Sequence, residues 1–244
     1  EMQRSLVGSE MCIRDSMNGA NTAGGYRPQP TSYDYDAPLG EWGNCYPKYY
    51  AFREVIQKHL PHGTVLPEVP ADNPTTTFAT IELKESAPLQ AAFHQTTESE
   101  NVLSMEDMGV DFGYIHYQTT INKAGKQKLI IQDLRDYAVI LVDGKQVASL
   151  DRRYNQNNVM LDIQKAPATL EILVENTGRV NYGPDILFNR KGITNQVLCG
   201  DEKLTGWSIT PLPLYKEKVS EMNFGESIQG KPAFHKGIFT LSLI

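Results

Sequence analysis

Hydrophobic residues recur with a helical period in one part of the chain, between residues 46 and 60. They follow one another at steps of three and four and fall on one stripe of a helix: Tyr49, Phe52, Val55, Ile56 and Leu60. Asn44 is a suitable N-cap, Pro47 fits the first turn, and Pro61 cannot continue a helix. The pattern therefore predicts an amphipathic helix over residues 46–60.

A proline-rich segment follows the predicted helix. Residues 61–76, PHGTVLPEVPADNPTT, contain four prolines. Proline lacks a backbone N–H and fixes φ, so this density of prolines excludes a helix or a central strand. We expect a linker over residues 63–76, with a domain boundary at that place.

Beyond residue 76 the hydrophobic period changes to two, which is typical of β-strands. Short β-rich runs are divided by Gly, Asp, Asn and Pro turns: FATIEL, YIHYQTTI, KLIIQ, YAVILVDGKQVASL and TLEILVEN. Runs of this length and spacing are characteristic of two antiparallel sheets packed face to face. We therefore expect a mainly β chain with an antiparallel β-sandwich over residues 77–240.

Two of these runs allow finer predictions. Tyr137 to Leu150 should form a hairpin, because Asp143-Gly144 supplies the positive φ angles of a two-residue turn. Within YIHYQTTI, alternate residues from Ile115 to Ile121 should face one side of a sheet. His116 then lies on the other side, where we expect it to be exposed or at the rim of the core rather than a ligand.

Composition and charge restrict the classes of function. The 244 residues are 40% hydrophobic and carry a net charge of −6, without a run of Lys and Arg, so a nucleic-acid partner is not expected. No apolar run reaches the roughly 20 residues that cross a bilayer, so no membrane partner is expected either. Cys45 and Cys199 are too far apart for a zinc motif, and no phosphate-binding loop or G-x-S-x-G motif occurs. We expect no metal and no cofactor.

The two ends of the chain look foreign to the rest. Ile13-Arg14-Asp15-Ser16 can be encoded by ATA AGA GAC AGN, and the opposite DNA strand then reads Leu-Ser-Leu-Ile, the residues from Leu241 to Ile244. Complementary ends are what translation through a sequencing adaptor on each side of an insert would give. We therefore expect residues 1–16 and 241–244 to be adaptor-derived and exclude them from the fold.

Several longer motifs carry a resemblance to a known family. They are MNGAN at 17–21, QPTSYDYDAPLGEWG at 29–43, KYYAFREVI, LRDYAVILVDGKQVASLDR at 134–152, LVENTGRVNYG at 173–183 and KGI at 191–193. In wording, order and spacing they closely resemble the β-galactosidases of glycoside hydrolase family 35. The resemblance spans residues 17–240.

The resemblance implies an architecture for the chain. The family has a (β/α)8 TIM barrel followed by β-sandwich domains of jelly-roll type. Residues 17–62 would then be the last loop and closing helix of a truncated barrel, and residues 77–240 a galactose-binding-like sandwich. Active sites of such barrels lie in loops at the C-terminal ends of the strands, which is where SYDYDAP at 32–38 would lie.

The resemblance also implies one substrate contact. The second tyrosine of SYDYDAP touches the sugar in the family, so this role carries over to Tyr35. A phenol suits galactose because its ring packs on C–H bonds while its hydroxyl forms hydrogen bonds. We expect Tyr33 to pack under the loop, and Asp34 and Asp36 to hold turns rather than act as acid and base. Trp42 either reaches a sugar subsite or packs on the helix.

The catalytic groups of the family are not expected in this chain. Retaining glycosidases use two carboxyl groups about 5–5.5 Å apart, and in the family these glutamates follow the fourth and seventh barrel strands. Those strands would precede Met17, since a TIM barrel takes about 250 residues. We therefore expect a fragment of a retaining exo-β-galactosidase that removes terminal β-linked galactose and is inactive by itself.

Two other interpretations remain open at this point. The chain could be a non-catalytic carbohydrate-binding or scaffolding sandwich, or a structural fragment that binds no sugar. For the whole enzyme, the resemblance favours the periplasm or the exterior of a bacterial cell over the lysosome.

Overall fold

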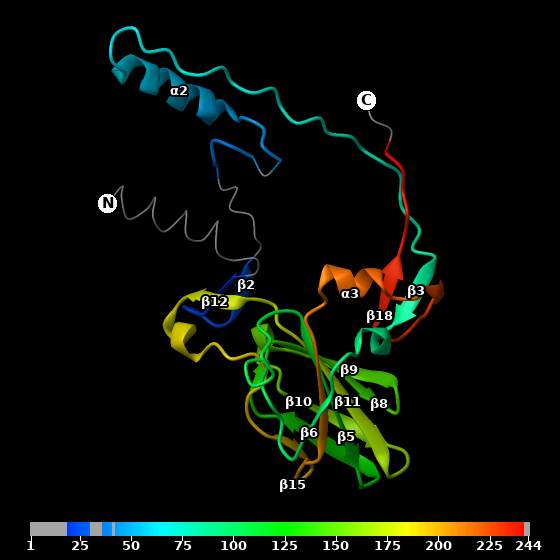
Figure 1. Ribbon diagram of the computed structural model, residues 1–244. Coiled ribbons are helices and arrows are strands. Elements are labelled where there is room, and N and C mark those ends of the chain that lie inside the picture. Colours follow the sequence, from blue (N-terminus) through cyan, green and yellow to red (C-terminus); the bar gives the residue numbers. More distant parts are fainter. Residues whose placement is uncertain (1–18, 30–35, 41, 242–244) are drawn as a thin grey trace. The chain divides into compact units, whose positions relative to one another are not determined.

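The computed structural model describes residues 19–29, 36–40 and 42–241 of the chain (Figure 1). These residues fall into two compact units. The first unit takes in Gln29–Thr80, and the second joins Ala20–Pro28 to the chain from Ile81 onward. A segment that precedes the predicted helix thus folds with the sandwich, while the domain boundaries expected from the sequence stay a prediction.

The first unit contains the helix α2, Pro47–His59, which confirms the helix predicted over residues 46–60. Its N-cap is Tyr46 and no side chain caps it, so the role predicted for Asn44 is wrong. Asn44 instead accepts the N–H of Gly40 through its backbone carbonyl, at 2.9 Å, and thereby closes a turn ahead of the helix. The apolar stripe of α2 is uncovered, since Phe52 and Ile56 are 52% and 50% exposed.

No helix or strand lies between the end of α2 and residue 85. The strand predicted for FATIEL at 78–83 is therefore wrong, and the first strand after the linker is β3, Glu85–Pro88. A β-prone sequence becomes a strand only where a neighbouring edge and a buried face are available. Leu83 is 55% exposed, so this segment lacks the burial that its alternating pattern suggested.

The second unit is a sandwich of two antiparallel sheets, which confirms the fold class expected for this part of the chain. One sheet has, in spatial order, β4 (Thr97–Ser99), β16 (Trp207–Leu212), β5 (Tyr114–Ile121), β11 (Ala168–Glu175), β8 (Tyr137–Val142) and β9 (Lys145–Asp151). The other has β10 (Asn158–Ile163), β6 (Gly125–Ile131), β14 (Val197–Cys199) and β15 (Glu202–Lys203).

Smaller elements complete this unit. Two short sheets are β13 (Gly192–Ile193) with β7 (Leu134–Arg135), and β17 (Gly225–Glu226) with β3 and β18 (Ala233–Lys236). A third joins β12 (Arg179–Tyr182), β1 (Gly19–Asn21) and β2 (Arg27–Gln29). The helices are α3 (Lys216–Ser220) and the 3-10 turns η1 (Leu89–Ala92), η2 (Arg152–Tyr154) and η3 (Pro184–Phe188).

The main core lies between the two large sheets. Alternate residues of β5, from Ile115 to Ile121, point into it, as the period of two predicted. Leu129 from the opposite sheet and Trp207 from β16 meet them there, and both are fully buried. The two sheets therefore share one continuous apolar layer, which is the main driving force for folding of a sandwich.

The predicted hairpin is confirmed. β8 and β9 pair in antiparallel register around Asp143 and Gly144, whose φ angles are +48° and +72°. Both angles lie in the left-handed region that a tight hairpin turn requires. Figure 1 shows β8 beside β11 in the same sheet.

The outer face of the six-stranded sheet is also covered. η1 and the segments around β3, β18 and α3 pack on it, with a second apolar cluster centred on Ala92, Leu173 and Leu212. His116 points to this face and is only 2% exposed, so the expectation that it would be exposed or at the rim of the core is wrong. The ring of Phe93 lies over it at 4.9 Å between centroids. The period of two identified the face, but not the layer that covers it.

Candidate functional site

The substrate contact expected from the sequence, Tyr35, lies outside the described residues, as do Tyr33 and Asp34. Their roles therefore stay predictions. The structure does describe the residues that follow them, which fix where this loop meets the helix.

The loop is joined to the first turns of α2 through Asp36. Lys48 on the helix donates to the Asp36 carboxylate at 2.6 Å and to the Asp36 carbonyl at 2.7 Å. Asp36 has a φ of +52° and its side chain is 87% exposed. An exposed pair of this kind adds little stability. Lys48 thus links the end of the loop to α2, and the turn role expected of Asp36 stays a prediction.

A short hairpin-like turn follows between residues 38 and 46. Leu39 and Cys45 form an antiparallel bridge, and the N–H of Tyr46 donates to the carbonyl of Pro38 at 3.0 Å. Gly40 suits this turn because a Cβ atom there would lie 2.1 Å from Oδ1 of Asn44. Trp42 is 44% exposed, and both interpretations of its role remain predictions.

A buried ionic cluster lies in the interior of the second unit. Lys191 is fully buried, and its ammonium donates to Oδ2 of Asp136 at 2.6 Å and to the carbonyl of Gly178 at 2.5 Å. The hydroxyl of Tyr26 donates to the same Asp136 oxygen at 2.6 Å. Arg152 pairs with the other oxygen, Oδ1, at 2.9 Å, and its guanidinium lies 4.3 Å from the centre of the Tyr26 ring.

Further donors complete the hydrogen bonding around this cluster. The N–H of Thr177 donates to Oδ2 of Asp136 at 3.1 Å. Arg179, two residues further on, donates to the carbonyl of Asp111 at 2.7 Å and pairs with Glu106 at 2.5 Å. The Asp136 carboxylate therefore accepts hydrogen bonds from several separate segments of the chain, which compensates the cost of burying it.

The electrostatics of the cluster follow from its burial. Burial lowers the pKa of Lys191 to about 8, although the Asp136 carboxylate acts in the opposite direction. Burial, followed by the negative charge of Asp136, raises the pKa of the Tyr26 phenol far above its usual range, so this phenol stays a donor. Lys191 is fully buried and Tyr26 is only 6% exposed, so we assign the cluster a structural role.

The cluster brings together motifs that are far apart in the sequence. It joins the motif LRDYAV through Asp136, ENTGRV through Thr177, KGI through Lys191, and the segment before the tyrosine-rich loop through Tyr26. Sequence reasoning found three of these motifs but missed their partner Tyr26. The available signal was Asp136, a charged residue placed two positions from each of the apolar residues Leu134 and Ala138, which are buried as it is.

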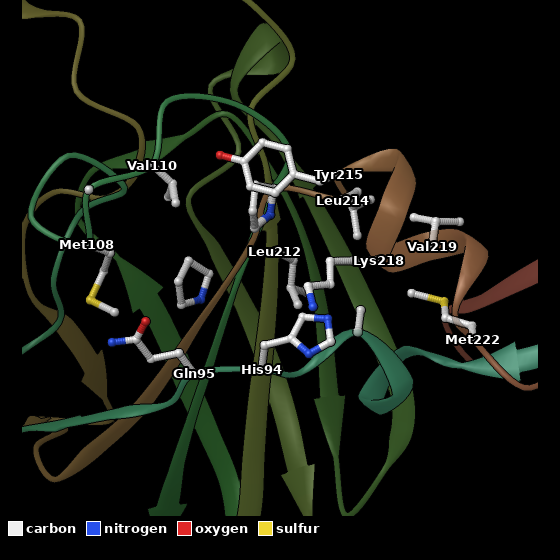
Figure 2. A pocket seen from close by; sticks show the side chains of 14 residues that line it. His94, Gln95, Met108, Val110, Leu212, Leu214, Tyr215, Lys218, Val219 and Met222 are labelled. Carbon is white, nitrogen blue, oxygen red and sulfur yellow. The ribbon is translucent and has the colours of Figure 1, made fainter.

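A cavity of about 330 Å³ opens between η1 and α3 (Figure 2). Figure 2 shows His94 and Lys218 among the mainly apolar side chains that line it, including Leu212 and Met222. None of its lining residues is an aspartate or a glutamate. The cavity therefore lacks the pair of carboxyl groups that a glycosidase requires.

Other candidate groups of the second unit are not assembled for metal chemistry. Among the described residues, no three His, Cys, Asp or Glu side chains are placed to hold a metal ion. Cys199 is buried, and burial raises the pKa of its thiol.

Within residues 19–29, 36–40 and 42–241, no helix is long and apolar enough to cross a membrane.

Comparison with family models gives two matches, one in each part of the chain. Residues 15–59 match the model described as "Glycosyl hydrolases family 35". Residues 102–213 match the model described as "Beta-galactosidase, first all-beta domain". The second range covers most of the sandwich, and the first covers the loop of Tyr35 and helix α2.

Curated relatives are similar over both ranges together. A "Beta-galactosidase" of Xanthomonas manihotis is 40% identical over 225 residues, which cover 91% of this chain and 37% of that protein. A "Beta-galactosidase" of Mus musculus is 39% identical over 210 residues, covering 80% of this chain and 31% of that protein. The chain thus spans about a third of the length of these relatives.

Among solved structures, a GH2 beta-galacturonidase from Eisenbergiella tayi matches 55% of this chain and 26% of its own, with a TM-score of 0.31 and 21% sequence identity. This likeness is too low to carry an argument.

Proposed function

The chain belongs to glycoside hydrolase family 35, and from this premise we propose that the whole protein is a retaining exo-β-galactosidase that releases terminal β-linked galactose. The observation that carries the proposal is the similarity over 91% of the chain to a bacterial "Beta-galactosidase", across both units. The substrate of the whole protein would be a β-galactoside of an oligosaccharide or glycan.

We propose that this chain supplies the sugar contact but not the catalytic carboxyl groups. In this arrangement residues 17–62 form the last loop and helix of a TIM barrel, and the sandwich is of jelly-roll type. The uncovered stripe of α2 supports this assignment, because the helices of a barrel bury such a stripe against its strands. The chain by itself would then release no galactose.

The ionic cluster attaches the segment that precedes the loop to the sandwich. Tyr26 ties Ala20–Pro28 to the sandwich, and Tyr35 follows Pro28 by seven residues in the sequence. On the other side of the loop, Lys48 holds Asp36. We propose that each attachment restricts the loop residues next to it, within its own unit, which lowers the entropy lost when a sugar binds.

The experiment that tests the proposal uses the full-length enzyme with Tyr35→Phe. Loss of one neutral hydrogen bond to the sugar costs about 0.5–1.5 kcal/mol, so kcat/KM on an aryl β-galactoside should fall by about two- to tenfold. Tyr50→Phe is the matched control, since Tyr50 is a 48% exposed tyrosine on α2. A full-length protein that hydrolyses no β-galactoside would refute the function, and equal kinetics of the two variants would remove Tyr35 from the site.

The periplasmic or extracellular location expected from the sequence stays a prediction, because the relatives include both a bacterial and a mammalian protein.

A further inference from the structure

A second cavity, of about 330 Å³, lies on the outer face of the six-stranded sheet. Its floor includes His116 of β5, Leu141 of β8 and Glu171 of β11. η1 and the segment from residue 228 to 232 form its walls. The volume falls at the lower end of the range of about 300–1,000 Å³ that small-molecule pockets occupy.

The floor carries a carboxylate that the fold holds in one position. Nε2 of the His116 ring lies 3.0 Å from Oε2 of Glu171, and the two side chains are only 2% and 13% exposed. The ring of Phe93 packs on His116 and restricts its rotation. Hydrogen bonding to His116 lowers the pKa of the Glu171 carboxyl, so this group stays ionised and presents its other oxygen, Oε1, as an acceptor.

The charge of the cavity is balanced. Lys231 lies in its wall, and its positive charge also acts on Glu171. An anionic ligand would meet the Glu171 carboxylate, and a cationic ligand would meet the Lys231 ammonium. A neutral ligand escapes both repulsions.

The remaining lining groups define the chemistry of a neutral ligand. Gln90 and Gln229 bring amides, each of which both donates and accepts hydrogen bonds, while Leu141 supplies an apolar surface. A sugar ring has the matching properties, since its hydroxyls donate and accept and one of its faces is made of C–H bonds. A few placed polar groups on an apolar lining are typical of small-molecule sites.

We propose that this cavity is an accessory saccharide site in the sandwich, in which Glu171 and the two glutamine amides bind sugar hydroxyls and Leu141 contacts the C–H face of the ring. The site is separate from the loop of Tyr35 in the sequence and performs no chemistry. Only the choice of galactosides as probes rests on the proposed function.

Binding to the purified 244-residue chain tests the proposal. Methyl β-galactoside and lactose are titrated separately and followed by chemical shifts of the backbone amides, with acetate and methylammonium as charged probes. At least one of the two sugars should bind with a Kd in the millimolar range and shift amides of β11 and the 228–232 segment, whereas the charged probes should not.

Three variants separate a site from a general surface effect. Glu171→Gln keeps the shape of the side chain but removes its charge, and should weaken sugar binding about tenfold or more. Gln229→Ala, at the exposed wall, should weaken binding about threefold without changing the urea midpoint of unfolding. Glu202→Gln, an exposed glutamate of β15 on the other sheet, should leave the Kd unchanged.

The proposal fails if neither sugar shifts the amides of the wild-type chain, if a charged probe binds there instead, or if Gln229→Ala and Glu202→Gln bind sugar equally well. Because no hydrolysis is measured, this outcome is independent of the proposed enzymatic function. An inactive full-length enzyme would refute that function and leave the binding result intact.

Discussion

Substitution of Asp136 by asparagine should strongly destabilise the sandwich. Asp136 is 1% exposed and is the shared partner of Lys191, Arg152 and Tyr26. Asparagine has nearly the same shape but no charge, so the fully buried Lys191 ammonium and the largely buried Arg152 guanidinium would lose their counter-charge. Breaking a buried ion pair by removing one partner costs about 3–5 kcal/mol.

The expected cost lies within this range for structural reasons. The amide oxygen of the asparagine would still accept a hydrogen bond from one of the groups that now donate to the Asp136 carboxylate. This remaining bond moderates the loss of unfolding free energy. Against this, two cations would remain close together in the interior, which adds repulsion. A loss of about 3–5 kcal/mol corresponds to a decrease in Tm of about 6–20 °C for a chain of this size.

Urea unfolding of the chain at pH 7, followed by circular dichroism, measures the change. Asp162→Asn is the matched control, because Asp162 is an exposed residue of β10, and it should change stability by less than about 0.5 kcal/mol. If both variants unfold at the same urea concentration, the cluster does not hold the sandwich together and the reasoning from buried charges is wrong.

Three further predictions follow from particular residues. Burial lowers the pKa of Lys191 to about 8, below the value of about 10.4 in an unfolded chain. The unfolded state therefore binds more protons than the folded state between these pH values, so the free energy of unfolding should rise by up to about 1.4 kcal/mol per pH unit from about pH 8 to about pH 10. Urea titrations should show this rise for the wild-type chain and not for Lys191→Met. Gly192→Ala should lower the thermal midpoint, because φ is +90° there and a Cβ atom would lie 2.5 Å from the Tyr117 hydroxyl; the expected cost is about 1–3 kcal/mol. Gly109→Ala is the control, because Gly109 also has a positive φ, +71°, but open space around it, so this variant measures backbone strain without crowding. The uncovered stripe of α2 should promote self-association of the chain, which light scattering would detect and Phe52→Ser should reduce; a monomeric wild-type chain at high concentration would contradict this.

The sequence by itself determined the elements whose pattern is local. The helix of residues 47–59 follows from apolar steps of three and four between two prolines, and the hairpin around Asp143-Gly144 from the backbone freedom of its turn. The alternation in β5 correctly identified which residues enter the main core. These features depend only on residues close together in the chain, so the sequence alone is enough to predict them.

Predictions that depended on a distant partner were wrong or incomplete. FATIEL has the composition of a strand, yet no sheet edge pairs with it, and His116 has the polarity of a surface residue, yet η1 and Phe93 cover it. Asn44 lies too early in the chain to cap α2 and closes the preceding turn instead. In the first two cases the outcome depended on whether a segment from elsewhere in the chain packs there.

The sequence motifs also pointed to a family without showing what joins them. Only the tertiary structure brings Tyr26, Asp136 and Lys191 to one place, although they are separated by up to 165 positions. The physical reason is that a buried charge requires its compensating charge and hydrogen bonds in space, and no rule of spacing along the chain expresses that requirement. The family and its local elements were thus readable in the residues, while the cluster and the cavity of Glu171 exist only in the folded chain.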